Sequence, residues 1–335
     1  MKFRSNPALV RGSIAPVVTP FTANGDLDDS SLRSLVRWQL ESGSHGISIG
    51  GSTGEPSSQS VAERIAAMRI VAEETADRVP FVPGTGSAKL DETLEMTEAA
   101  MKLGADIALV ITPYYSRPTQ DGLFAWYSEI AATFPDMPIV LYNVPIRTAV
   151  DVAPETVARL RRAHPNIVGI KETTKDFEHY SQTFRRCGSD LLMWSGIELL
   201  CLPLLAIGGI GFVSAVANIA PRAVADMYQS WVDGDTERAV ELHYALHPLV
   251  DLLFVETNPA PIKRVLERSG IIASGYVRPP LIPVTDKGQR PIEDLLVEGL
   301  PALDGPPAEL ARRLSHADPG RVGPTPVGAN GTASA

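Results

Sequence analysis

The sequence predicts an α/β fold, a (β/α)8 TIM barrel followed by additional C-terminal helices. Short β-rich apolar runs alternate with amphipathic helical stretches, and eight such units fit within about 220 residues. No GxGxxG motif follows the first run, and the alternation continues past the sixth unit. Both observations favour a closed barrel over an open doubly wound sheet, in which that glycine motif often follows the first strand.

The eight predicted strands occur at regular intervals along the chain, each bounded by turn residues. In chain order they are residues 12–21, 46–52, 79–86, 105–115, 138–145, 167–174, 191–196 and 211–219. Between them lie helical patterns with acids early, bases late and Gly or Pro at their ends, as helix boundaries prefer. These patterns include residues 31–43, 61–77, 89–104 and 154–165.

The sequence divides into three predicted parts. Residues 1–235 form the barrel, and residues 236–303 form a helical extension packed on it. The extension begins with the helical stretch 235–254, whose first residue closes the barrel part. Residues 304–335 form a Pro-, Gly-, Ala- and Ser-rich tail, which has too little apolar surface to fold and is predicted to be disordered.

Composition limits the partners of the chain. The formal net charge is -9, and no basic run is present, so nucleic acid is not expected as a partner. The N-terminus has no apolar signal core and no stretch is long enough to span a membrane, which predicts a cytoplasmic protein without membrane contact. Cys187 and Cys201 form no cluster, and His243 and His247 lack a third ligand nearby, so no metal site is predicted.

The carboxyl ends of the predicted strands carry the candidate site, because chemistry in this fold occurs there. Their sequences are "GGSTGEP", "GTGS", "TPYYSRP", "YNVPIRT", "KETT", "SGIE" and "SAVAN". Hydroxyls, tyrosines, glycines, one lysine and arginines meet at this end, whereas no histidine and no carboxylate cluster does. This composition argues against a metal hydrolase or a Ser-His-Asp triad.

Lys171 directly follows the apolar run of the sixth strand. It shares strand parity with Ile167 and Gly169, and if that face points inward its amine enters the barrel, where burial disfavours the charged ammonium. A neutral amine condenses with a ketone or aldehyde to form an imine, which acts as an electron sink. The alternative is a buried ion pair of Lys171 with Glu172 or Glu55, and the strand alone does not choose between them.

Other strand ends supply groups suited to imine chemistry. Tyr142, Thr53 and one of Tyr114 or Tyr115 offer hydroxyls that could relay protons without a histidine. The "GGSTGEP" turn offers backbone N–H groups and hydroxyls to a carboxylate, and Arg147 offers a bidentate grip on a second one. These groups predict two small anionic substrates.

Taken together, the motifs "GGSTGE", "TPYY", "YNVPIRT", "GIKETT" and "NPAPIK" occur in order over residues 12–300. In this the sequence resembles the pyruvate-dependent class I aldolases of the dihydrodipicolinate synthase and N-acetylneuraminate lyase family. The resemblance implies that Lys171 forms a Schiff base with pyruvate and that Tyr142 is the acid/base. It also implies that Ser52 and Thr53 bind the pyruvate carboxylate, that Thr53 links the hydroxyl relay, and that Tyr115 completes the relay from a neighbouring subunit.

The same resemblance implies further substrate-binding positions at Gly51, Gly196 and Val213, a homotetramer built as a dimer of dimers, and no cofactor beyond the imine. It is closest to the synthase branch, in which Arg147 would hold the carboxylate of L-aspartate 4-semialdehyde and the product is 4-hydroxy-tetrahydrodipicolinate. Ile197 stands where an aspartate is common in that branch, which would make the acceptor pocket less polar.

Two alternatives remain at this stage. A catabolic aldolase, dehydratase or hydratase-aldolase could use the same lysine on a 2-keto-3-deoxy sugar acid or an aryl-substituted pyruvate. A catalytically silent barrel could serve as a binding protein, which the joint presence of Lys171, Tyr142 and Thr53 disfavours.

Overall fold

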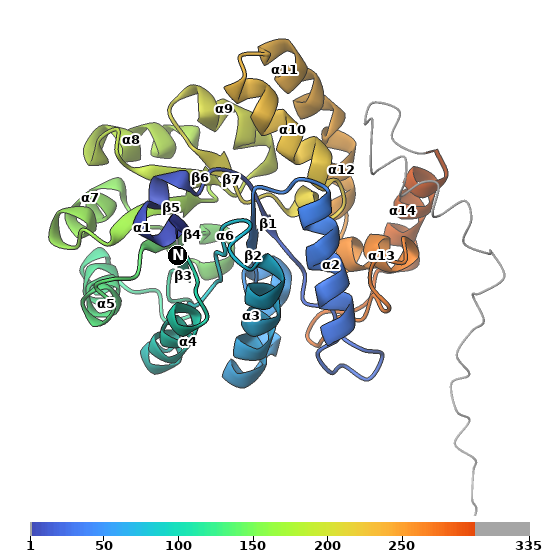
Figure 1. Ribbon diagram of the computed structural model, residues 1–335, viewed down its shortest axis with the longest axis horizontal. Helices are drawn as coiled ribbons and strands as arrows, with labels where there is room; N and C mark the ends of the chain where they lie inside the picture. Colours follow the sequence, from blue (N-terminus) through green and yellow to red (C-terminus); the bar gives the residue numbers. More distant parts are fainter. Residues whose placement is uncertain (1, 299–335) are drawn as a thin grey trace, which may run out of the picture.

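The computed structural model describes residues 2–298 of the chain. The predicted tail at 304–335 lies outside the described residues. Figure 1 shows the strands at the centre of a ring of helices, with α11 to α14 gathered on one side next to α10 and α2. The strands are β1 Gly12–Pro16, β2 Gly46–Ser48, β3 Ala108–Ile111, β4 Ile139–Asn143, β5 Ile167–Glu172, β6 Leu192–Ser195 and β7 Gly211–Phe212.

The helices follow the strands in alternation and then continue beyond the barrel. Those of the barrel are α1 Lys2–Ser5, α2 Asp29–Glu41, α3 Val61–Thr75, α4 Leu90–Lys102, α5 Gln120–Thr133, α6 Pro145–Thr148, α7 Pro154–Ala163, α8 Phe177–Cys187, α9 Cys201–Ala206 and α10 Pro221–Val232. The later ones are α11 Thr236–Ala245, α12 His247–Leu253, α13 Ala260–Arg268 and α14 Asp286–Glu298.

The sheet is parallel and closes on itself. Its strand order is β2-β1-β7-β6-β5-β4-β3, and residues 81–84 fill the gap between β2 and β3 through the bridges Ile47↔Phe81 and Gly84↔Leu109. This segment is the third predicted strand. It forms bridges rather than a continuous ladder because Pro83 lacks the N–H that a strand residue would donate there. The prediction of a (β/α)8 barrel is confirmed.

Two apolar clusters follow from the alternation of side chains along the strands. The inner cluster fills the barrel and includes Ile14, Val140, Tyr142, Trp194 and Val213. The outer cluster packs the other faces of the strands against the helices. Because the interior is filled with side chains, chemistry is confined to the end of the barrel.

A β-bulge in β5 changes which side chains face the interior. Ile139 pairs with Ile167, but Val140 pairs with Gly169, so β5 has one extra residue at this point. Ile167 therefore belongs to the outer cluster, while Val168 packs against the inner one. The prediction that Ile167 shares the inner face with Lys171 is wrong, because the bulge inverts the parity between them.

The C-terminal helices share the outer cluster with the barrel. Ala239 and Leu242 of α11 and Leu249 of α12 belong to it. The helical stretch predicted at 235–254 is divided into α11 and α12 at Leu246, where Pro248 occupies a first-turn position of the second helix. The boundary at residue 235 remains a prediction. No helix among residues 2–298 is long and apolar enough to cross a membrane.

Candidate active site

Lys171 and Tyr142 lie side by side at the ends of β5 and β4. The two residues are register partners on adjacent parallel strands, and each is 5% exposed. The Lys171 Nζ atom lies 4.0 Å from the centre of the Tyr142 ring. A primary amine and a phenol are thus held together at the carboxyl edge of the barrel, as the sequence predicted from strand positions alone.

The Lys171 amine makes no hydrogen bond or ion pair with any residue in the described part of the chain. The two acids considered as its partners are engaged elsewhere. Glu55 pairs with Lys263, and Glu172 points to the outer face, where its carboxylate accepts from Asn143 Nδ2 at 3.0 Å. The alternative of a buried ion pair for Lys171 is therefore contradicted, because consecutive strand residues point to opposite faces.

Two acidic groups close to Lys171 are themselves poorly suited as counter-charges. Burial raises the pKa of the Glu198 carboxyl, and it raises the pKa of the Cys201 thiol as well. Glu198 Oε1 accepts a hydrogen bond from the backbone N–H of Ala215 at 2.8 Å. Since burial favours the neutral form of both groups, neither provides a strong fixed anion for the Lys171 amine.

The hydroxyl next to Tyr142 is that of Ser52. Tyr142 Oη lies 3.2 Å from Ser52 Oγ, whereas Thr53 Oγ1 accepts a hydrogen bond from Asn258 Nδ2 at 3.2 Å. Both residues begin the 3₁₀ turn Ser52–Gly54, in which consecutive side chains leave in different directions. The structure thus differs from the predicted relay through Thr53, and it brings Ser52 to that place.

A cavity of about 230 Å³ opens beside these groups. Four predicted site residues line it: Gly51, Ser52, Tyr142 and Arg147. Arg147 lies on the exposed surface of the short helix α6, and its Nη2 atom is 3.5 Å from the carbonyl oxygen of Asn258. Because this hydrogen bond is long and the side chain is exposed, the guanidinium is accessible to an anion at the mouth of the cavity.

The two neighbouring tyrosines take opposite positions. Tyr114 lines the cavity, whereas Tyr115 is 93% exposed and has a φ of 75°. Positive φ is uncommon for a bulky residue and costs conformational energy. Within this chain, therefore, Tyr115 is directed to solvent, and of the two tyrosines it is Tyr114 that shares the cavity with Tyr142.

Gly196 lies against the Lys171 side chain, and Val213 belongs to the inner cluster of the barrel. The Val213 backbone N–H donates to the Ser195 carbonyl at 2.8 Å. At Gly196 an added Cβ would lie 2.6 Å from Lys171 Cε and 2.5 Å from Thr173 Oγ1. Gly196 is therefore the residue that leaves room for the lysine side chain.

The Gly196→Ala substitution is expected to lower turnover by about 100-fold, because a displacement of a reacting group by about 1 Å has that effect. Overpacking should also cost about 1–3 kcal/mol of unfolding free energy. Steady-state kinetics and thermal unfolding measure both effects. Gly122→Ala in α5, where the nearest contact of a new Cβ is 3.2 Å, serves as the control. Unchanged turnover in Gly196→Ala would show that the Lys171 side chain accommodates the added methyl group without displacement of its amine.

Sequence reasoning gave no role to Lys263 or Asn258, although both lie in the motif "NPAPIK". Lys263 is fully buried, pairs with Glu55 and donates to the Tyr276 carbonyl at 2.9 Å. Burial lowers the pKa of Lys263 to about 8. Lys263 lies among the buried apolar residues Ile262, Val265 and Leu266 of the amphipathic helix α13. Only the fold shows that it pairs with Glu55, directly after the Ser52–Gly54 turn.

Metal-binding groups are not gathered here. No cluster of three or more His, Cys, Asp or Glu side chains suited to a metal occurs among residues 2–298. His243 and His247 face one another, with their Nε2 atoms 3.4 Å apart.

A buried lysine facing a tyrosine at the carboxyl end of a (β/α)8 barrel defines an enzyme of the class I aldolase type, which works through an imine on lysine. The chain belongs to the dihydrodipicolinate synthetase family, whose model matches residues 9–298. The family predicted from the motifs is confirmed.

Two relatives with similar sequences have the same name. The chain is 46% identical to the 4-hydroxy-tetrahydrodipicolinate synthase of Thermus thermophilus over 277 residues, which are 83% of this chain and 92% of the relative. It is 42% identical to that of Methanopyrus kandleri over 81% of this chain and 90% of the relative.

Solved structures agree with this comparison. The 4-hydroxy-tetrahydrodipicolinate synthase of Methylacidiphilum fumariolicum has a TM-score of 0.83 at 35% identity, covering 92% of this chain and 99% of the other. A dihydrodipicolinate synthase from Acinetobacter baumannii in complex with pyruvate has a TM-score of 0.82 at 37% identity, covering 86% of this chain and 98% of the other.

Proposed function

We propose that the chain is a 4-hydroxy-tetrahydrodipicolinate synthase, which condenses pyruvate with L-aspartate 4-semialdehyde. The observation that carries this proposal is the Lys171 amine, which is buried, has no ionic partner among residues 2–298 and lies 4.0 Å from the centre of the Tyr142 ring. The names of the relatives at 46% and 42% identity, and the pyruvate complex of a structural neighbour, support it.

The reaction follows from the groups present. The Lys171 amine attacks the ketone carbon of pyruvate, and loss of water gives an imine. Loss of a proton from the pyruvate methyl group then gives an enamine, whose carbon attacks the aldehyde of the second substrate. Attack of the amino group of the condensed substrate on the imine carbon then closes the ring and expels the Lys171 amine, so that the C=N bond passes from the enzyme to the product. Each proton transfer needs a hydroxyl in place, and Tyr142 is the hydroxyl-bearing residue whose ring lies against the amine.

The remaining site residues divide between the proton relay and carboxylate binding. Ser52, at 3.2 Å from Tyr142 Oη, continues the relay. Gly51, Ser52 and Thr53 lie in the turn suited to the pyruvate carboxylate, with Gly196 and Val213 as further substrate-binding positions. No cofactor is part of this proposal, since the imine itself supplies the electron sink.

The relay in this proposal ends on Tyr115 of the partner subunit in a homotetramer built as a dimer of dimers. The solvent-exposed position and positive φ of Tyr115 support this part, because a strained aromatic residue at an active-site loop needs a partner to bury it. A cytoplasmic location remains a prediction from the sequence.

Arg147 decides the acceptor, and its substitution tests the substrate. In an assay that couples product to NADPH oxidation by a reductase, Arg147→Ala should lower kcat/KM for L-aspartate 4-semialdehyde about 10- to 150-fold. That range corresponds to a lost charge-assisted hydrogen bond of about 1.5–3 kcal/mol. Trapping of pyruvate should be unchanged, and Arg185→Ala, an exposed residue on α8, is the control.

No turnover of the semialdehyde by a protein that still traps pyruvate would overturn the choice of acceptor. The chemistry on Lys171 would then stand, and 2-keto-3-deoxy sugar acids and aryl-substituted pyruvates would be the next substrates to assay.

A further inference from the structure

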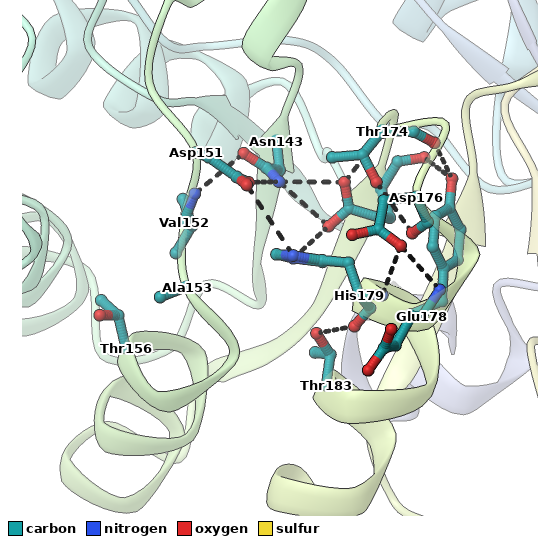
Figure 2. A network of polar contacts seen from close by, with 12 residues as sticks. Asn143, Asp151, Val152, Ala153, Thr156, Thr174, Asp176, Glu178, His179 and Thr183 are labelled. Atoms are coloured by element: carbon teal, nitrogen blue, oxygen red, sulfur yellow. Dashed lines mark hydrogen bonds and ion pairs between the residues drawn. The ribbon is translucent and has the colours of Figure 1, made fainter.

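A second group of polar side chains lies behind the catalytic pair, on the outer face of the same two strands. Glu172 follows Lys171 in β5, Asn143 follows Tyr142 in β4, and the two are register partners. Figure 2 shows Asn143, His179 of α8 and Asp151 of the loop that follows α6 in one network, in which Asp151 contacts both of the others. The network therefore begins one residue away from each group of the proposed chemistry.

Glu172 is the centre of these contacts and is fully buried. One carboxylate oxygen accepts from the backbone N–H groups of Thr173 and Thr174, at 2.9 and 3.1 Å. Asn143 Nδ2 donates to the two oxygens at 3.0 and 3.1 Å. The carboxylate thus ties the end of β5 both to its own loop and to the end of β4.

His179 lies against this buried acid. Its Nε2 atom lies 3.3 Å from Glu172 Oε2, and its Nδ1 atom lies 3.9 Å from Asp151 Oδ2. Burial opposes the charged imidazolium, but the contact with Glu172 and the charges of Glu172, Asp151 and Asp176 outweigh it and raise the pKa of His179. The buried carboxylate is therefore paired rather than isolated, which its burial requires.

Asn143 extends the network to the loop after α6. Its Nδ2 donates to Asp151 Oδ1 at 2.7 Å, and its Oδ1 accepts from the backbone N–H of Val152 at 3.1 Å. Helix α6 carries Arg147, so this loop connects the acceptor-binding side of the cavity to the strand that carries Lys171.

We propose that Glu172, Asn143 and His179 form a positioning network on the outer face, which holds the ends of β4 and β5 in register so that Lys171 and Tyr142 lie side by side on the inner face. None of the three touches the cavity, so they act through their neighbours. The inference rests on the proposed function, because its readout is the imine on Lys171. The bulge earlier in β5 shifts its pairing with β4 by one residue, and the network ties the two strands together beyond that point, at the end that carries Lys171 and Tyr142.

The test compares Glu172→Gln and His179→Gln with Glu178→Gln, an exposed α8 residue adjacent to His179 whose side chain lies outside the network. Gln at 172 turns an acceptor into a donor that faces the Asn143 amide. Gln at 179 removes the cation but keeps a polar side chain of similar reach. The probe is pyruvate, and the measured quantity is the rate at which borohydride-trapped adduct forms per folded molecule, alongside kcat and KM.

We expect both network variants to slow trapping and kcat about 10- to 100-fold, with a smaller change in KM for pyruvate, because the reacting groups are misplaced rather than the binding turn. Glu178→Gln should match the parent chain. Wild-type trapping rates in folded network variants would overturn the inference, and so would a loss of activity equal to the loss of folded protein. If Glu172→Gln fails to fold, the trapping rate and kcat of His179→Gln decide whether the inference holds.

A parent chain that forms no pyruvate adduct would instead overturn the proposed function, which distinguishes the failure of the inference from the failure of the function.

A second measurement examines the contact between His179 and Glu172. The folded state raises the pKa of His179, so its contribution to unfolding free energy is complete below about pH 6.5 and is lost as the pH rises through the raised value. His179→Gln should flatten this part of the stability profile, and an unaltered profile would show that His179 does not pair with Glu172.

Discussion

Substituting Lys171 by Ala should abolish the pyruvate adduct and lower turnover by about 10⁶-fold, the scale of loss when a covalent nucleophile is removed. The fold should survive, because the amine has no ion-pair partner among residues 2–298 and its removal strands no buried charge. Turnover in the coupled assay and the mass of the borohydride-reduced protein are the two measurements.

The matched control is Lys175→Ala, an exposed lysine four residues further along the chain. It should keep both the adduct and the turnover of the parent chain. A reduced adduct that persists in Lys171→Ala, or that maps to another lysine, would contradict the mechanism in its first step.

Substituting Tyr142 by Phe should lower kcat by about 10² to 10⁴, the range in which a positioned acid/base contributes. The ring would remain over the Lys171 Nζ atom, so packing and lysine placement should be retained. The hydroxyl next to Ser52 would be lost, and with it the transfer of protons to and from the imine. Steady-state kinetics with both substrates measures the effect.

Tyr244→Phe provides the comparison, because Tyr244 is 64% exposed on α11. It should leave kcat unchanged. An unchanged kcat in Tyr142→Phe would mean that the phenol is a packing group and that another proton carrier serves the imine.

Several features of the site could be predicted because they depend on short stretches of sequence. The position of Lys171 at the end of a strand follows from the apolar run before it, and strand ends in this fold converge on one face. The positions of Tyr142 and Arg147 follow from the same reasoning, applied to the end of the preceding strand. Gly196 was named from its motif, and the structure supplies its reason, which is the space for Lys171 Cε.

Other features could not be predicted because they depend on contacts between distant segments. Ser52 and Thr53 are adjacent hydroxyls, and only the path of the 3₁₀ turn decides that Ser52 faces Tyr142. Glu172 was considered as an ionic partner of Lys171, yet it faces His179 on the other side of the wall. The inward parity assigned to Ile167 failed because a bulge leaves no reliable mark in a single sequence.

The amino-acid sequence by itself determined the barrel, the family and the position of Lys171 at the end of a strand, because hydrophobic periodicity and ordered motifs are local properties of the chain. Only the tertiary structure decided that Ser52 contacts Tyr142 and that Glu172 points away from Lys171. It also decided that Asn143 and His179 contact Glu172 on the outer face of the two strands. Ser52 and Tyr142 are 90 positions apart in the chain, and Asn143 and Glu172 are 29 apart. Such contacts depend on strand register and barrel closure, which are set by the packing of the whole molecule.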